Sequence, residues 1–408
     1  MRTLVGVLYT LLPGMVLFVM AALLTPHVAR FSAPALLAAE IVSGIILLLA
    51  LALSLQFNHS RIFFALLTLL GLCGGVLLMT QTGNPVTRAT LNGTLCLLVP
   101  VNLLVFCFSP ERGVFSRYGA TRFGLLGIEV LVIAALAGFQ AAPVAAALHV
   151  KFTQLAVFSH TPVTQPGWLL FATGLLLLND RLIQRHSAEL AAFFFALLAG
   201  AVILHRQDAA GMTAFGAAIA AGFGHAIIQQ SWNMAYLDTL TGLPGRRALE
   251  EQMRQIAGPH VIAMLDVDHF KRFNDNHGHD VGDHVLRFVA SRLQKNAGGG
   301  RPFRYGGEEF CILYLAKEAH EVMPVLEALR SDIENCRFEM RNRQRRAQEE
   351  GADTGKPQAT GPLAVTVSIG MAHAPHDGTD PWSVLKAADQ ALYAAKHAGR
   401  NRIHMSGA

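Results

Sequence analysis

Charged residues are scarce in this sequence. Asp, Glu, Lys and Arg together make up 15% of the 408 residues, whereas hydrophobic residues make up 52%. Average soluble domains contain about 25% charged residues, so this composition argues against a chain that is soluble throughout. The shortage is confined to residues 1–230, which are mostly apolar, and the remainder has the mixed composition of a globular domain. The length and this division together indicate at least two domains.

Cysteine is also rare, and its few copies form no recognisable pattern. There are five cysteines, an odd number, and no two of them form a CxxC pair. This arrangement gives no support to a disulfide framework or a zinc site, and a reducing compartment suits the second half of the chain. We expect small buried hydrophobic side chains at Cys73, Cys96, Cys107, Cys311 and Cys336.

Long apolar runs dominate the first half. A helix needs about 20 mostly apolar residues to cross a bilayer, because the hydrocarbon offers its backbone no water. We therefore expect residues 1–228 to form an all-α multi-pass membrane domain of about eight helices, which acts as a sensor or an anchor. The sixth and seventh stretches are the shortest, so seven spans are the alternative. The stretches are residues 4–24, 34–56, 62–80, 89–108, 123–139, 168–179, 190–204 and 212–228.

The distribution of basic residues predicts the orientation. Cytoplasmic loops carry an excess of Lys and Arg, so the richer side should be cytoplasmic. This places the N-terminus and the domain after residue 230 inside the cell, with the chain in the cytoplasmic (inner) membrane. Basic residues that flank apolar runs also explain the net charge of +5 without a nucleic-acid partner. With eight spans, the richer side has Arg2, Arg61, Arg112, Arg117, Arg122, Arg181 and Arg185, and the other has Arg30, Arg88, Lys151 and Arg206.

Few ionisable residues interrupt the apolar stretches. Glu40 and Glu129 are the notable carboxylates, and His225 lies near the end of the last stretch. A charged group inside a bilayer is costly, so these residues are candidates for a sensing or transport site. The alternative is that both Glu side chains lie near helix ends or pair inside the bundle. No pair of broken helices is evident, which argues against a transporter, and the sequence does not identify a sensory ligand.

No Pro/Gly linker separates the two halves. Residues 229–237 (QQSWNMAYL) follow the last span directly, and we expect them to form a short helical connector to a domain at residues 238–408. Such a helix could transmit a rotation or a change in pairing. The alternative is a simple tether.

In the second half, two carboxylates end a predicted strand. The run PHVIAMLDVD at residues 259–268 is apolar and contains β-branched residues, which is typical of a buried strand. Side chains alternate along a strand, so Asp266 and Asp268 share a face and Val267 points away. Carboxylate oxygens suit Mg²⁺, which commonly also binds phosphates. Two such acids are frequent in proteins, so this pattern alone is weak evidence.

A second motif, RYGGEEF at residues 304–310, places two further carboxylates beside a turn. Gly306 and Gly307 stand between two strand-like runs, which predicts a hairpin, and their lack of side chains leaves room for a bulky planar ligand. Glu308 and Glu309 are costly beside each other unless a cation neutralises them. The alternative is a solvated acidic hairpin without a ligand. It would explain the turn alone, but it is disfavoured by the presence of the strand that carries Asp266.

Basic and amide side chains complete the pattern. Lys271 follows the strand and could meet phosphate charge, and Asn274 and Asp283 offer donors and acceptors that suit a guanine edge. Lys396 and Arg400 are four residues apart near the end of a predicted helix. That spacing would place both on one helix face, available to a triphosphate. A solvated basic helix end is the alternative for this last pair.

Taken together, these residues resemble the GGDEF domain of diguanylate cyclases. Five motifs occur in the order and approximate spacing of that family, and GGEEF is one of the two active-site forms that the family uses. The motifs are DTLTGLPGRR (238–247), LDVDHFKRFNDNHGHDVGD (265–283), RYGGEEF (304–310), VTVSIGMA (365–372) and ADQALYAAKHAGRNRI (388–403).

The resemblance implies a fold, a cofactor and residue roles. The fold would be α+β, like the palm of nucleotide cyclases and polymerases, with a mainly antiparallel sheet flanked by helices. Two Mg²⁺ ions per site, replaceable by Mn²⁺, would be held by Asp266, the Val267 carbonyl and Glu308. Glu308 would also be the base for the attacking hydroxyl, with Glu309 close by and Lys271 stabilising the transferring phosphate. The substrate would be bound by Phe270, Asn274, His279, Asp283, Gly306, Gly307, Lys396 and Arg400.

The implied reaction condenses two GTP molecules into cyclic di-GMP and two pyrophosphates. Each domain would hold one GTP and two domains would meet face to face, so a homodimer is needed; cyclic di-GMP receptors would be downstream partners. Positioning and charge neutralisation would supply most of the catalysis. One alternative is a degenerate domain that only binds GTP or a partner, against which the intact motifs argue. Another is a receptor or transporter with a secondary GGDEF tail.

The sequence departs from the family's pattern in three places. The inhibitory product site RxxD, which many members carry before GGEEF, is absent, because Ala297 and Gly300 occupy its positions. We therefore expect weak or no product inhibition through that site. Gly245 replaces the usual Asn, with little expected effect. Residues 337–362 are charged and contain Gly and Pro, which indicates a solvated helix end and loop, with partner binding as the alternative.

Overall fold

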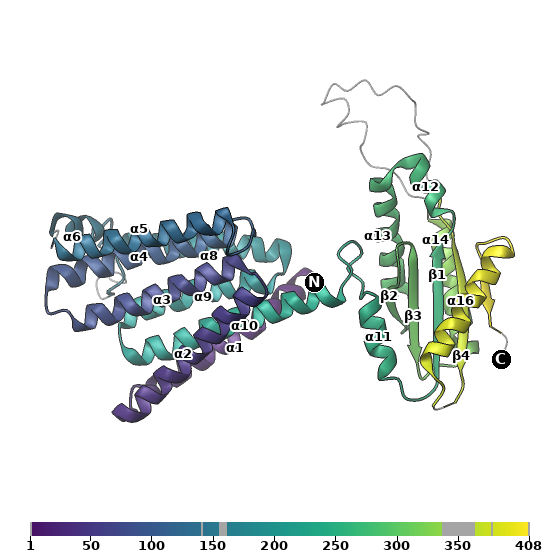
Figure 1. Cartoon of the computed structure of the whole chain (residues 1–408), viewed down its shortest axis with the longest axis horizontal. Coiled ribbons are helices and arrows are strands. Elements are labelled where there is room, and N and C mark those ends of the chain that lie inside the picture. Colours follow the sequence, from purple (N-terminus) through teal and green to yellow (C-terminus); the bar gives the residue numbers. More distant parts are fainter. Residues whose placement is uncertain (1, 140–141, 155–160, 337–363, 377, 407–408) are drawn as a thin grey trace, which may run out of the picture. The chain divides into compact units, whose positions relative to one another are not determined.

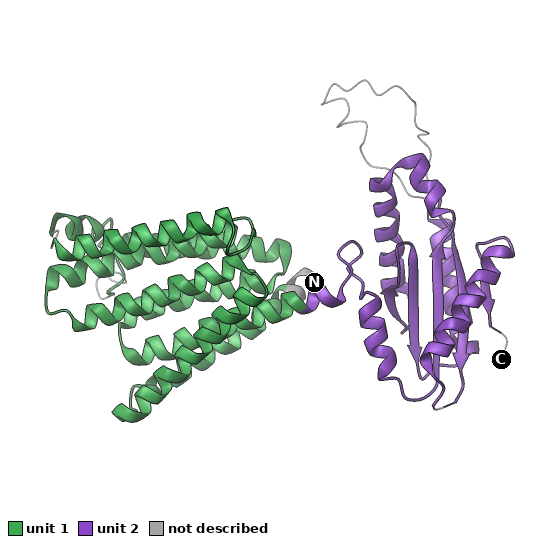
Figure 2. Ribbon diagram, viewed as in Figure 1, with its two compact units in different colours: residues 1–231 green, residues 232–408 purple. Residues whose placement is uncertain are grey.

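The computed structural model describes residues 2–139, 142–154, 161–336, 364–376 and 378–406 (Figure 1). The chain divides into two compact units, residues 1–231 (unit 1) and residues 232–408 (unit 2) (Figure 2). The charged stretch at residues 337–362 lies outside the described residues, so its predicted conformation is not tested.

Unit 1 is helical throughout its described secondary structure. All eight predicted apolar stretches lie in long helices, and a short helix, α6, follows the fifth. The helices are α1 (Arg2–Val28), α2 (Ala33–Gln56), α3 (Ser60–Gln81), α4 (Pro85–Phe108), α5 (Arg117–Gly138), α6 (Ala142–Leu148), α8 (Gln165–Arg185), α9 (Ala188–Arg206) and α10 (Ala209–Tyr236).

Seven of these helices are long and apolar enough to cross a membrane, namely α1 to α5, α9 and α10. The sixth predicted stretch is helical but is not among them. Its helix, α8, is 21 residues long and carries Asp180, Arg181 and Arg185 in its last two turns. The length suffices for a bilayer, at about 1.5 Å per residue, so it is polarity and not length that separates α8 from the others.

Two polar side chains inside unit 1 are bonded to each other. The Asn102 amide on α4 donates to the Glu129 carboxylate on α5 over 2.7 Å. The structure thus favours the alternative in which Glu129 pairs inside the bundle, because a partner offsets part of the cost of a carboxylate among apolar helices. Glu40, in contrast, lies on an exposed face of α2.

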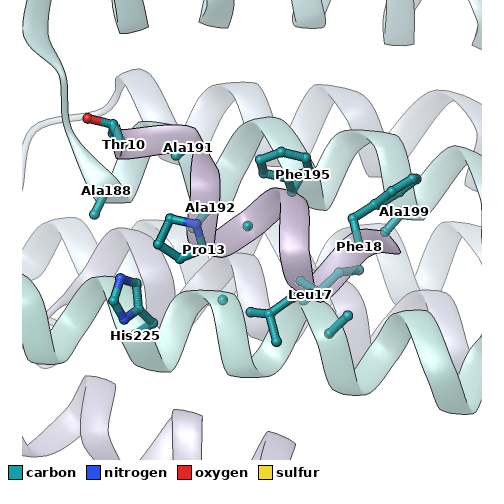
Figure 3. Close-up of a pocket in the computed structure, with 14 residues that line it drawn as sticks. Thr10, Pro13, Leu17, Phe18, Ala188, Ala191, Ala192, Phe195, Ala199 and His225 are labelled. Carbon is teal, nitrogen blue, oxygen red and sulfur yellow. The ribbon is translucent and has the colours of Figure 1, made fainter. Parts of the chain in front are cut away.

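A small, mainly apolar recess, partly open to the surroundings, lies between α1, α9 and α10 (Figure 3). Small side chains of α9, including Ala188, Ala191 and Ala192, form one wall, and Leu17 of α1 contributes to another. His225 of α10 is the ionisable side chain at this recess.

The connector is part of a helix. Helix α10 runs without interruption from Ala209 to Tyr236, so residues 229–236 continue the last apolar helix, as an uninterrupted helical sequence predicts. The helix ends where the Tyr236 carbonyl accepts a hydrogen bond from the Gly245 N–H (2.7 Å) and Leu237 pairs with Pro244 in an isolated bridge. The DTLTGLPG segment therefore folds back on the end of α10.

Unit 2 contains a five-stranded sheet in the order β2-β3-β1-β4-β5. Strands β1, β2, β3 and β4 pair antiparallel, and β5 pairs parallel to β4. This confirms the α+β fold with a mainly antiparallel sheet. The strands are β1 (His260–Val267), β2 (Arg301–Arg304), β3 (Glu309–Leu315), β4 (Val367–Ala374) and β5 (Ile403–Met405).

Helices cover both faces of the sheet. The odd-numbered residues of β1, such as Val261 and Leu265, share a core with α13 (His279–Asn296) and α14 (Ala319–Asn335). The even-numbered Ile262 and Met264 share a second core with α11 (Arg246–Arg254) and α16 (Pro381–His397). A further helix, α12 (Phe270–His277), follows β1 directly. Since β1 is buried along its whole length, its last even-numbered residue, Asp266, necessarily faces the α16 side.

Candidate active site

Asp266 is a buried carboxylate paired with a lysine. Its side chain is 5% exposed, and its Oδ2 lies 2.8 Å from Nζ of Lys396 on α16. Burial raises the pKa of Asp266, although the hydrogen bond and positive charge of Lys396 oppose this. Gly370 on β4 makes the pairing attainable, because a Cβ there would lie 2.0 Å from the Leu392 nitrogen. Helix α16 therefore packs its backbone directly on the sheet, one turn before Lys396.

The GGEEF segment forms the predicted hairpin beside Asp266. Strands β2 and β3 are joined by residues 305–308, and Glu309 stands opposite Asp266 in the ladder. The Glu309 carbonyl accepts hydrogen bonds from the N–H groups of Tyr305 and Gly306, and the Val267 N–H donates to the Glu308 carbonyl over 3.3 Å. A Cβ on Gly306 would come within 2.7 Å of a Glu309 carboxylate oxygen, whereas one on Gly307 would meet nothing within 4 Å.

Asp266 acts on both glutamates of the hairpin. Burial raises the pKa of Glu308 and of Glu309, and the negative charge of Asp266 raises both further. Lys396 opposes these shifts with its single positive charge. The site thus holds more negative charge than its own lysine neutralises, which favours a bound cation.

Among the described residues, no three His, Cys, Asp or Glu side chains converge closely enough to hold a metal ion as they stand. The positive charge beside Asp266 is the Lys396 ammonium. The donor chemistry nonetheless fits Mg²⁺, because Asp266, Glu308 and the main-chain carbonyls of β1 are hard oxygen ligands.

Asp268 has a different task from Asp266, although the two share a face. Its carboxylate accepts hydrogen bonds from the hydroxyls of Thr366 (2.7 Å) and Ser368 (2.6 Å) and from the Asn401 N–H (3.1 Å). Its own N–H donates to the Thr366 carbonyl over 2.9 Å. Asp268 therefore ties the end of β1 to β4 and to the turn after α16.

The proposed guanine-binding residues lie on α12 and α13. Asn274 presents a buried Oδ1 that has no hydrogen-bond partner in the described structure. Gly282 leaves the room for it, since a Cβ there would lie 1.9 Å from that oxygen. Such an unsatisfied acceptor is costly unless a ligand donates to it. His279 and Asp283 lie one turn apart on α13, which places them on the same face.

Two residues assigned to the substrate lie in contrasting surroundings. Lys271, on α12, is exposed, as a phosphate-binding side chain requires. Phe270 is 7% exposed and belongs to the core shared with α13, so its side chain anchors α12 to the domain. The sequence motif alone could not separate these two positions.

The prediction that Lys396 and Arg400 share a helix face is wrong. Helix α16 ends at His397, and Gly399, Arg400 and Asn401 follow with positive φ angles of 113°, 62° and 47°. This left-handed turn is incompatible with continuing the helix. Arg400 still acts on the same centre, because its positive charge, like that of Lys396, opposes the rise in the pKa of Asp266 that burial causes.

An ion pair that sequence reasoning missed supports the GGEEF turn. Arg304 donates from Nε to the Gly306 carbonyl (3.2 Å) and from Nη2 to the Gly307 carbonyl (2.6 Å). Its Nη1 lies 2.8 Å from Oδ1 of Asp238, which also accepts from the N–H and hydroxyl of Thr241. Burial alone would raise the pKa of Asp238, but the bonds from Thr241 and Arg304 hold it below its ordinary value. The sequence offered one sign of this pair, since Asp238 and Arg304 are the first residues of the motifs DTLTG and RYGGEEF.

Comparison with known proteins gives the same picture for unit 2. Residues 235–402 match the family model described as "Diguanylate cyclase, GGDEF domain". Diguanylate cyclase DgcP of Pseudomonas aeruginosa is 36% identical over 191 residues, 45% of this chain and 26% of that protein. Response regulator PleD of Caulobacter vibrioides is 34% identical over 184 residues, 43% of this chain and 37% of that protein.

Coverage of the relatives is partial. The chain spans 58% of protein YhcK of Bacillus subtilis, at 31% identity over 240 residues, and smaller shares of DgcP and PleD. Among solved structures, the coiled coil and GGDEF domain of DgcB from Caulobacter crescentus, in complex with c-di-GMP, is 33% identical and has a TM-score of 0.37. It is matched over 44% of this chain and 89% of that one. The family match, together with the GGEEF hairpin and its carboxylates, shows that residues 235–402 are a GGDEF domain.

Proposed function

We propose that this protein is a membrane-bound diguanylate cyclase that condenses two GTP molecules into cyclic di-GMP and two pyrophosphates. The observation that carries the proposal is the carboxylate centre of the GGDEF domain. Asp266 lies beside Lys396, and its charge raises the pKa values of Glu308 and Glu309 across the hairpin. An acid-rich centre flanked by cationic side chains suits a magnesium nucleotide.

In this proposal Asp266, Glu308 and the Val267 carbonyl hold Mg²⁺, with Mn²⁺ as a substitute. The metal would neutralise phosphate charge and polarise the α-phosphate. Lys396 would exchange its bond to Asp266 for contact with the triphosphate, which it shares with Arg400. Lys271 would stabilise charge on the transferring phosphate from its exposed position on α12.

The guanine base would be bound between α12 and α13. The unpartnered Oδ1 of Asn274 needs a donor, and a guanine supplies N–H groups on its edge. Asp283 would accept a second such bond and His279 would lie at the substrate. The small turn at Gly306 and Gly307 leaves space for the nucleotide at the hairpin.

Bond formation would begin with the 3′-hydroxyl of one GTP and the α-phosphate of the other. Glu308 would accept the hydroxyl proton as the general base. The 3′-oxygen bonds to the α-phosphorus as pyrophosphate leaves. The 3′-hydroxyl of the second GTP then attacks the α-phosphate of the first in the same way, which releases the second pyrophosphate and closes the ring. Each domain holds one GTP, so the proposal requires a homodimer.

The membrane arrangement is also part of the proposal. If α8 crosses the bilayer with the seven more apolar helices, the crossings are even in number and both ends of the chain lie on the same side. The excess of Arg residues on that side would make it the cytoplasm. The GGDEF domain then has access to GTP from its place at the inner membrane. Helix α10 would carry a signal received in unit 1 to the domain, whose product acts on cyclic di-GMP receptors. The domain boundaries we propose are residues 1–228, 229–237 and 238–408.

The test is cyclic di-GMP formation by the full chain in lipid nanodiscs, supplied with GTP and Mg²⁺ and analysed by chromatography. We expect product from the parent chain and none above background from Glu308→Gln. If the parent and the Glu308→Gln variant both bind GTP and neither forms product, the protein is a degenerate GTP-binding domain and not a cyclase.

A further inference from the structure

Arg400 has an unusual backbone for a residue that is assigned to phosphates. It lies in the middle of three consecutive residues with positive φ, of which Gly399 alone lacks a side chain. A left-handed conformation costs a non-glycine residue about 1–3 kcal/mol and persists only where the surroundings impose it. The direction in which the Arg400 side chain leaves the chain is fixed by this turn. What imposes the turn therefore also positions Arg400.

Asn401 is the most heavily bonded residue of the turn. Its N–H donates to Asp268 Oδ2 over 3.1 Å, and its Nδ2 donates to Glu334 Oε1 over 2.7 Å. Its Oδ1 accepts from Nη1 of Arg330 over 2.7 Å. Both polar ends of the side chain and the backbone N–H are thus engaged. Asn also tolerates a positive φ better than most residues, so its chemistry suits both the conformation and the bonds.

The two α14 partners of Asn401 are themselves held together. Arg330 donates from Nη1 to Glu334 Oε2 over 2.7 Å, and its side chain is 13% exposed. Hydrogen bonds from Arg330 and Asn401 lower the pKa of Glu334, so it stays charged near neutral pH. Arg330 also bonds Glu327, through Nε and Nη2, whereas its bond to Asn401 is made by Nη1. The anchor of the turn is therefore a charged pair on a neighbouring helix.

We propose that Glu334, Arg330 and Asn401 are positioning residues, which hold the 399–401 turn so that Arg400 meets the terminal phosphates of the nucleotide. This inference rests on the proposed function, since it takes GTP as the ligand of Arg400. It adds residues on α14, which carries none of the site motifs. Asp268, which follows β1, supports the turn from the other side, because its carboxylate accepts a hydrogen bond from the Asn401 N–H. The hydroxyls of Thr366 and Ser368 hold that carboxylate in place.

The test is a double-mutant cycle on nucleotide binding by the full chain in nanodiscs. The ligand is a GTP analogue with a methylene group at the α,β-bridge, which binds without turnover. Asn401→Gly keeps a residue that accepts positive φ and removes the side-chain bonds. We expect it to weaken binding about tenfold in the parent, within the coupling expected of contacting residues, and less than about twofold when Arg400→Ala is already present.

Three comparisons separate positioning from a general structural effect. GMP, which lacks the terminal phosphates, should bind equally to the parent and to Asn401→Gly. Glu334→Ala should weaken binding of the analogue as Asn401→Gly does, whereas Glu334→Gln, which keeps an acceptor for the Asn401 amide, should retain most of the affinity. The matched control is Glu327→Ala, which removes a carboxylate bonded to Arg330 on the same helix and should leave affinity unchanged.

An Asn401→Gly effect of equal size with and without Arg400, or an equal loss for GMP, would overturn the positioning role. In either case the parent would still bind the analogue, so the proposed function would stand. A parent chain that binds neither nucleotide would overturn the proposed function and this inference with it.

Discussion

In unit 1, the buried Arg122 is held by neighbouring polar groups, whereas in unit 2 burial and the charge of Asp266 raise the pKa values of Glu308 and Glu309. Arg122 on α5, which is 8% exposed, donates to the hydroxyls of Ser60 and Ser109 and to the Pro110 carbonyl, each over 2.7 Å. Asp266, Glu308 and Glu309 share one lysine. Polar groups that satisfy one another hold helices together, and groups with unbalanced charge are suited to a ligand.

A second cluster in unit 1 supports the same distinction. Arg61 of α3 lies 3.5 Å from Glu189 of α9, and Glu111 accepts hydrogen bonds from the N–H groups of Ser60 and Arg61. These contacts join the ends of α3 and α9 to the segment after α4. Arg122 joins this group through the Ser60 hydroxyl, so two arginines offset Glu111 and Glu189 and leave no excess charge to attract a ligand.

The largest expected effect comes from removing a charge of the acidic centre. Asp266→Asn should reduce cyclic di-GMP formation at least about 100-fold, because a bound metal supplies several kcal/mol of charge stabilisation in such transfers. The matched control is Asp275→Asn, an exposed acid on α12, which should keep parental activity. Comparable rates for Asp266→Asn and the parent would show that the unbalanced charge has no catalytic use.

Loosening the GGEEF turn should have the next largest effect. Arg304→Ala removes the bonds to Gly306, Gly307 and Asp238. We expect kcat to fall on the order of 10–100-fold, as small displacements of reacting groups can cost that much. Arg304→Lys should restore little, since a single ammonium cannot bond in three directions as a guanidinium does. Full activity of Arg304→Ala would contradict the role of this pair.

Breaking the Arg122 contacts tests the other half of the comparison. Arg122→Ala should destabilise unit 1 by about 2–3 kcal/mol, because buried hydrogen-bond partners lose their donor. Thermal labelling of the buried Cys96 and Cys107 thiols reports the opening of unit 1. Arg117→Ala, at an exposed position of the same helix, is the control. GTP affinity should be unchanged in both variants, and a loss in Arg122→Ala alone would show that the units are coupled through this cluster.

The pH dependence of stability gives a smaller effect. The raised pKa of Glu309 means that the folded state binds its proton more tightly than the unfolded state. This destabilises the charged folded form as pH rises from about 4.3, the ordinary value, through the raised pKa. Without Mg²⁺, Glu309→Gln should therefore be slightly more stable than the parent at pH 7, by less than about 1 kcal/mol after solvent screening. At pH 4 the difference in unfolding temperature should vanish; a difference independent of pH would contradict the charge repulsion.

The smallest expected effect is that of added cyclic di-GMP on the initial rate of the reaction. Ala297 and Gly300 stand where the family's inhibitory site has charged residues, so added cyclic di-GMP should leave the initial rate unchanged. Inhibition that disappears when residues 296–300 are replaced would show that this segment binds product after all. Inhibition that survives the replacement would instead point to competition at the active site.

Much of the fold followed from local sequence patterns. The apolar runs predicted the long helices of unit 1, and the strand ending in Asp266 and the hairpin at Gly306 appear as expected. Local patterns could not reveal contacts between distant residues. Arg304 and Asp238 are 66 residues apart, and Asn401 and Asp268 are 133 apart. Arg400 was misplaced for the same reason, since the turn after His397 is stabilised by bonds to α14 and β1 and not by its own spacing.

The most direct test of the account is the balance of products made from GTP by the full chain in nanodiscs with Mg²⁺. Pyrophosphate and cyclic di-GMP would be quantified in the same samples over time. The account predicts two pyrophosphates for each cyclic di-GMP, and neither product from Asp266→Asn. Phosphate release with GDP as the product, or bound GTP that yields no cyclic di-GMP, would contradict it.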